Sequence, residues 1–135
     1  MEDKKIKWLI YTVLVGLIPV LSRLLIWIVT KSNVIALVSA SDFISFGLIL
    51  HISNINEIEH LEPSDKSWKT IQNGISIAFI AMYSVLSALL LFKDSNSEII
   101  DSVAIERSAL CLSIVSFCIS FSVFHRISKF QKTGE

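Results

Sequence analysis

The chain alternates between long apolar runs and short polar breaks. Four runs stand out, at residues 8–30, 34–53, 71–92 and 103–124. Each is close to the roughly 20 residues that a helix needs to cross the hydrocarbon core of a bilayer. Backbone groups inside a bilayer need internal partners, and runs of this length favour helices over the shorter strands of a barrel. The pattern predicts an all-α polytopic membrane protein, with four transmembrane helices in one domain over residues 1–135.

The polar breaks set the expected ends of these helices. A short turn centred near Ser32 joins the first two. In the middle segment, isoleucine or leucine recurs every third residue from Ile52 to Leu61, which continues a helical face until Pro63 ends it. We therefore expect the second helix to extend past the membrane into the cytosol. The expected helices lie at about residues 8–30, 34–62, 66–93 and 102–127.

Composition and charge agree with a membrane location. Hydrophobic residues make up 53% of the chain and charged residues only 18%, against about 25% charged in soluble domains. Twelve basic and twelve acidic residues give a net charge of zero, which argues against a nucleic-acid partner. The basic residues concentrate at both chain ends and in the middle loop. The positive-inside rule therefore places the N-terminus, the C-terminus and the middle loop in the cytoplasm.

Two opposite charges, Arg23 and Asp42, lie inside the first two apolar runs. They are nine and ten residues from the turn at Ser32, so at 1.5 Å per residue both lie roughly 14 Å below it. We expect them to pair, because each alone costs roughly 2.5–3.5 kcal/mol at a helix centre. Ser39 and Ser45 lie on the same polar stripe as Asp42. The pair is either a structural salt bridge or a gate, proton site or pore-lining charge.

Small residues line faces of the third and fourth helices. Such faces allow close helix approach, and the fourth helix carries two of them on opposite sides. They predict helix packing within one chain or an interface of a homo-oligomer. The residues concerned are Gly74, Ala78, Ala81, Ser113, Ser116 and Ser120.

Catalytic and metal-binding patterns are missing from the sequence. We find no nucleophile–base pair, phosphate-binding loop or metal-ligand spacing, so we expect no enzyme activity, cofactor or metal. His60 lies within an acidic strip formed by Glu57, Glu59 and Glu62, without the spacing of a metal site. With Trp68 nearby, this strip is a candidate docking site for a cytosolic protein partner.

In its size, four helices, cytosolic termini and a second helix that extends into an acidic middle loop, the chain resembles the four-span membrane subunits of bacterial anti-phage defence systems of the Kiwa type. The resemblance covers the layout and carries over no functional residue. It implies a homo-oligomer among the lipids of the bacterial inner membrane, which senses or alters membrane state together with a cytosolic partner. The alternative is a small ion channel or proton-coupled transporter, although the first helix lacks the glutamate of small drug/proton antiporters.

Overall fold

Helices account for nearly all of the described chain. The computed structural model describes residues 6–60 and 66–133. Within these ranges it contains no strand, and the prediction of an all-α fold is confirmed. The elements are η1 (Leu9–Leu14), which is a π-helix, α2 (Val15–Val29), α3 (Ala40–Glu59), α4 (Lys66–Ser95) and α5 (Ser102–Thr133).

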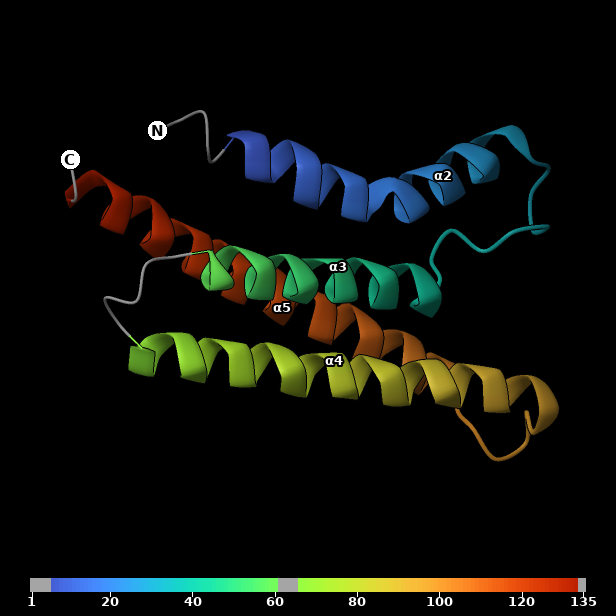
Figure 1. The fold of residues 1–135 in the computed structure, drawn as a ribbon. Helices are drawn as coiled ribbons and strands as arrows, with labels where there is room; N and C mark the ends of the chain where they lie inside the picture. The colour runs from blue at the N-terminus through green and yellow to red at the C-terminus, as the bar shows by residue number, and fades with distance from the viewer. Residues whose placement is uncertain (1–5, 61–65, 134–135) are drawn as a thin grey trace.

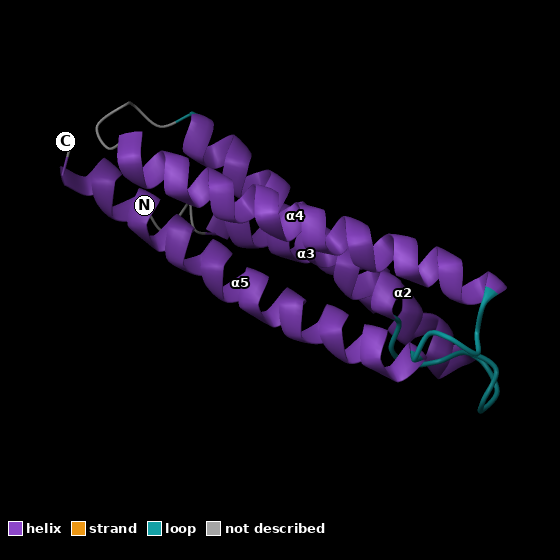
Figure 2. Cartoon of the chain, turned by 90° about the horizontal axis from the view of Figure 1, so that it is seen from below, coloured by secondary structure: helices purple, strands orange, loops and turns teal. Residues whose placement is uncertain are grey.

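The four long helices form an elongated bundle, in which neighbours along the chain run in opposite directions (Figures 1 and 2). The start of the first helix, the end of α3, the start of α4 and the end of α5 lie at one end of the bundle. The linkers over residues 30–39 and 96–101 lie at the other end. Helix α3 occupies the middle and packs against α2, α4 and α5, whereas the backbone of α2 comes close to α3 and η1 alone among the described helices.

Three helices of the described chain are long and apolar enough to cross a membrane. They cover Ile6–Val29, Lys66–Ser95 and Ser102–Lys129, with 24, 30 and 28 residues. By length and composition these helices are consistent with a multi-pass membrane protein. Helix α3 is not among them; its 20 residues include six strongly polar side chains, those of Asp42, His51, Asn54, Asn56, Glu57 and Glu59.

Many apolar side chains are exposed on the bundle surface and several polar side chains are buried, which is the reverse of the pattern in a soluble domain. On the outer helix α2, Leu25, Ile28 and Val29 are 63%, 64% and 79% exposed. On the inner helix α3, the polar side chains of His51 and Asn54 are 0% and 2% exposed. Polar residues of membrane bundles face the bundle interior, and apolar residues face lipid. The bundle therefore places the buried polar side chains of α3 inside an apolar shell.

The predicted start of the second helix, at residue 34, is wrong. Residues 30–39 form a linker in which Asn33 adopts a left-handed backbone, with φ at 71°. The linker ends at Ser39, whose backbone is extended, and the helix begins at Ala40. Residues 39–42 read Ser-Ala-Ser-Asp, a Ser-x-x-acid pattern typical of helix starts. Helix α3 then ends at Glu59, short of the predicted end at residue 62, which lies outside the described residues.

The other predicted helices differ from the structure only at their ends. The first helix extends over Ile6–Val29 and includes η1. Pro19 has no N–H with which to bond the carbonyl of Val15. The π-helix ends at Leu14, and α2 begins at Val15. The third and fourth helices start where predicted and continue to Ser95 and Thr133.

Candidate functional site

An ion pair joins α2 to the start of α3. Arg23 donates a hydrogen bond from Nε to Oδ2 of Asp42, and their side chains are 27% and 11% exposed. Asp42 is the third residue of α3, so it also lies near the positive end of the helix dipole. The sequence predicted that these two residues meet across a short turn near Ser32. The structure brings them together across the ten-residue linker over residues 30–39 instead.

The two serines of the predicted polar stripe hydrogen-bond locally. Ser39 lies in the linker, not on the helix, and its hydroxyl is 3.1 Å from that of Ser41. The Ser45 hydroxyl donates to the backbone oxygen of Ser41, one helical turn earlier. The Ser39 side chain makes no capping hydrogen bond at the start of α3.

A buried polar chain links α3 to α4 and α5 deeper in the bundle. His51 on α3 is fully buried, and each of its ring nitrogens contacts a serine hydroxyl. Nδ1 is 3.2 Å from Ser76 on α4, and Nε2 is 2.9 Å from Ser116 on α5. The Tyr83 hydroxyl on α4 is 2.7 Å from the same Ser116 hydroxyl. We call these four residues, Ser76, His51, Ser116 and Tyr83, the His51 chain.

Two further polar contacts continue along α3 toward its C-terminal end. Asn54 donates from Nδ2 to the Ser120 hydroxyl of α5 at 2.9 Å, and both residues are buried. On the opposite side of α3, the Ser53 hydroxyl lies 3.1 Å from Thr12 of η1. Helix α3 is thus tied by side-chain hydrogen bonds to η1, α4 and α5, and by an ion pair to α2.

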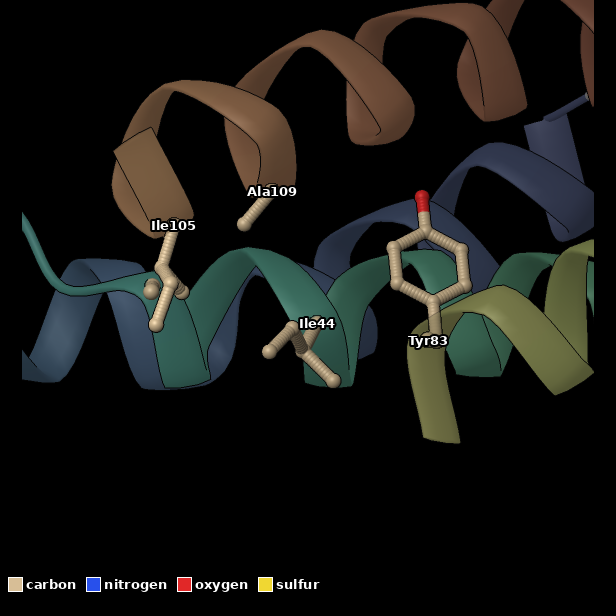
Figure 3. Close-up of a cluster of buried hydrophobic side chains, with 5 residues drawn as sticks. Ile44, Tyr83, Ile105 and Ala109 are labelled. Carbon is tan, nitrogen blue, oxygen red and sulfur yellow. The ribbon is translucent and has the colours of Figure 1, made fainter. Parts of the chain in front are cut away.

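Tyr83 reaches the His51 chain because of a glycine on α3. A Cβ atom added at Gly47 would overlap the Tyr83 ring, so only glycine lets the ring lie against the helix backbone. Figure 3 shows the Tyr83 hydroxyl pointing from α4 toward α5, with Ile44, Ile105 and Ala109 in the same buried cluster. The His51 ring also stacks on Phe79, with ring centroids 4.8 Å apart.

This arrangement suits a mechanical or proton-handling role. The His51 chain connects donors and acceptors on three helices, and an imidazole can accept a proton on one nitrogen while releasing one from the other. The same contacts fix the rotation of α3 relative to α4 and α5. Among the described residues, no three His, Cys, Asp or Glu side chains gather as metal ligands.

The residues of the predicted docking strip lie in different settings. Glu57 and Glu59 are exposed at the end of α3, and Glu62 lies outside the described residues. Trp68 is half-buried, packs against the cluster of Ile58, Val123 and Ile127, and lies under the Arg126 guanidinium. Of the three glutamates in the predicted strip, the structure therefore describes Glu57 and Glu59, and both are exposed.

The small residues predicted for helix packing fall into two groups. The α5 serines Ser113, Ser116 and Ser120 are buried inside the bundle. Gly74, Ala78 and Ala81 on α4 are exposed on its outer face, and a Cβ at Gly74 would meet no atom within 4 Å. Intramolecular packing thus uses the serines and leaves the α4 face outward.

Sequence reasoning missed the His51 chain. Gly47, His51, Asn54 and Ile58 follow one another at intervals of three or four, which marks a single helical face. That spacing indicates a buried helix face that includes polar residues. The partners on α4 and α5 carry no comparable signal, because serine recurs on several faces of both helices.

No family model matches this chain, and no match was found among the curated proteins or the solved structures.

Proposed function

We propose that this protein is an integral subunit of the bacterial inner membrane that senses or transmits membrane disturbance to a cytosolic partner in anti-phage defence. In this proposal α3 is a fourth, inner membrane span, and both termini are cytoplasmic. One observation carries the proposal: buried polar side chains of α3 bond to the surrounding helices through hydrogen bonds and one ion pair, and the end of α3 bears the exposed residues Glu57 and Glu59.

The contacts that hold α3 are weak enough for the helix to switch between two positions. Hydrogen bonds between membrane helices average about 0.6 kcal/mol each, so the few that hold α3 sum to a few kcal/mol. A free-energy difference of this size leaves a minor state populated and open to a shift by ligand or membrane state. Movement of α2 in a disturbed bilayer acts on α3 through Arg23 and Asp42. The displacement of α3 then changes the position of Glu57 and Glu59.

A homo-oligomer forms part of this proposal. The outward face of Gly74, Ala78 and Ala81 permits close approach of a second helix, as small residues do in membrane interfaces. Replacement of Ala78 by cysteine in a chain lacking Cys111 and Cys118 should give a cross-linked dimer in membranes. The same cysteine at Leu91, which is 74% exposed and lies about 140° around α4 from Ala78, should cross-link less.

The defence role is tested by phage challenge of the native host. We expect deletion of the gene to raise phage plating, and the Glu57→Lys/Glu59→Lys double variant to behave like the deletion while still inserting in the membrane. The matched control is Glu98→Lys, an exposed charge reversal in the 96–101 linker at the opposite end of the bundle. Equal plating on wild-type and deleted cells would contradict the proposal.

Proton-coupled transport is the second candidate, and the His51 chain is the observation that favours it. A continuous series of donors and acceptors through His51, Ser116 and Tyr83 is the kind of path along which protons move in membrane proteins. In liposomes with a pH-sensitive dye, transport predicts proton flux that His51→Leu abolishes. Ser84→Ala serves as control, because the Ser84 hydroxyl bonds only the backbone of its own helix. Flux equal to that of empty liposomes would exclude this function.

A further inference from the structure

A pocket of about 250 Å³ lies where the start of the first helix meets the last turns of α3 and α5. These three segments are at the same end of the bundle (Figure 1). The pocket is smaller than the roughly 300–1,000 Å³ of sites for drug-sized ligands, so it suits a small polar head group. The lining residues used below are Lys7, Trp8, Glu57, Phe124 and Ile127.

Two opposite charges line this pocket from different helices. Lys7 lies at the start of the first helix and Glu57 lies in the last turn of α3, and both are exposed. Neither side chain forms a salt bridge with the other or with a further residue of the described chain. A ligand that satisfies both groups must therefore carry a negative and a positive charge close together.

The end of α3 favours the positive charge of the ligand on the Glu57 side. The carbonyl groups at the C-terminal end of a helix carry partial negative charge, which attracts cations. Helix α3 has no basic residue in its last turn, so no cation of its own answers this charge or that of Glu57.

The apolar wall of the pocket is formed by α5 and the first helix. Trp8 stacks on Phe124 with ring centroids 5.0 Å apart, and both are buried together with Ile127. The ring of Phe121 lies 6.5 Å from that of Trp8, one turn further from the end of α5, and is 49% exposed. An acyl chain that extends from a head group in the pocket can pack against this exposed ring.

The position of the pocket along the bundle identifies the ligand as a lipid. The stretch of the first helix that is long and apolar enough to cross a membrane begins at Ile6, and that of α5 ends at Lys129. Lys7 and Ile127 therefore lie at the ends of two such stretches. Basic residues and tryptophan are enriched at this level, next to lipid head groups.

We propose that the pocket binds the head group of a zwitterionic phospholipid with a primary ammonium, of the phosphatidylethanolamine type. The ammonium donates hydrogen bonds to the Glu57 carboxylate, Lys7 binds the phosphate, and an acyl chain packs against Phe121. This site requires that the first helix and α5 cross a membrane and is independent of the defence or transport role. It shares Glu57 with the predicted docking strip, but lipid binding by the purified protein needs no partner, so each proposal can fail without the other.

Retention of lipid by the full-length protein in detergent, measured by native mass spectrometry, tests this site. The lipids are phosphatidylethanolamine, phosphatidylcholine, whose quaternary ammonium has no N–H, and phosphatidylglycerol, which is anionic. The wild type should retain phosphatidylethanolamine most strongly. Glu57→Gln should weaken this retention about fivefold, the upper end for one exposed ion pair, and remove the preference over phosphatidylcholine. The matched control is Glu59→Gln, which should leave retention unchanged, because Glu59 is exposed about 200° around the same helical turn.

The Lys7→Gln variant tests the phosphate contact separately. It should weaken the retention of phosphatidylethanolamine about fivefold, the effect of one basic residue at a membrane surface, but keep the preference over phosphatidylcholine. Its control is Lys31→Gln, an exposed lysine at the opposite end of the bundle, which should bind lipid like the wild type. Both sites are exposed and glutamine favours helix about as well as lysine or glutamate, so the variants should fold.

Three outcomes would overturn the proposal. The first is equal retention of phosphatidylethanolamine and phosphatidylcholine by the wild type. The second is stronger retention of phosphatidylglycerol than of phosphatidylethanolamine, which would indicate a site for anionic lipid. The third is an equal loss of phosphatidylethanolamine in Glu57→Gln and Glu59→Gln, which would indicate a general effect of surface charge.

Discussion

Gly47 determines how close α4 comes to α3. The Tyr83 ring occupies the space that a Cβ atom would take, and from there its hydroxyl meets Ser116. Gly74, by contrast, lies on the outer face of α4 with open space around it. The two glycines thus have different structural roles, and their substitution distinguishes these roles.

We expect Gly47→Ala to lower the free energy of unfolding in detergent by about 1–3 kcal/mol, the usual cost of overpacking a filled core. The added methyl group displaces the Tyr83 ring and breaks its bond to Ser116. Gly74→Ala should instead be neutral or stabilising by up to about 1 kcal/mol, because alanine favours helix over glycine. Equal effects of the two substitutions in thermal unfolding would show that the Tyr83 contact does not limit stability.

Helix α3 illustrates what the sequence could and could not predict at the scale of elements. The long apolar runs predicted the other helices and most of their ends, because hydrophobic length is a local property. The start of α3 was mispredicted, because residues 34–38 are apolar and contain no glycine or proline to indicate a linker. The Ser-x-x-acid pattern at Ser39 and Asp42 was the local signal available. The side of α3 that meets Ser76 and Ser116 depends on packing between helices, which single-helix periodicity does not contain.

The contact of Arg23 with Asp42 yields a prediction for the pairing of α2 and α3. Arg23→Leu should lower the free energy of unfolding by about 3 kcal/mol, the low end for breaking a buried pair, because the arginine is 27% exposed. The double variant Arg23→Leu/Asp42→Leu should recover most of this loss, since no charge is then left unpaired. Exchange of the two charges should also restore folding.

Thermal unfolding of the four purified proteins in one detergent measures these effects. If the double variant is no more stable than Arg23→Leu, the cost comes from lost packing of the arginine stem and not from the unpaired carboxylate. An exchanged pair that folds but no longer protects cells from phage would assign the pair a role beyond holding α2 against α3.

At the scale of the whole molecule, the position of the linkers predicts an even number of membrane crossings. The linkers over residues 30–39 and 96–101 lie at one end of the bundle, and the end of α3 and the start of α4 lie at the other (Figure 1). If α3 crosses the membrane, both linkers face the same compartment. If it does not, they face opposite compartments.

Labelling of single cysteines with a membrane-impermeant maleimide separates these two topologies. In a chain with Cys111→Ser and Cys118→Ser, we expect Ser32→Cys and Ser97→Cys to react in intact spheroplasts. Glu59→Cys should react only after the membrane is permeabilised, because the proposed orientation places the end of α3 in the cytoplasm. Reaction of Ser32→Cys without reaction of Ser97→Cys would exclude α3 as a membrane span.

The polar interior of the bundle also has a consequence for biogenesis. Asp42 has its partner Arg23 on the earlier helix α2, but the partners that satisfy His51 and Asn54 are on helices synthesised later. We therefore expect α3 to wait at the insertion machinery until α4 and α5 emerge, so that three helices enter the bilayer as one unit. A chain truncated before α5 should remain bound to that machinery or be degraded.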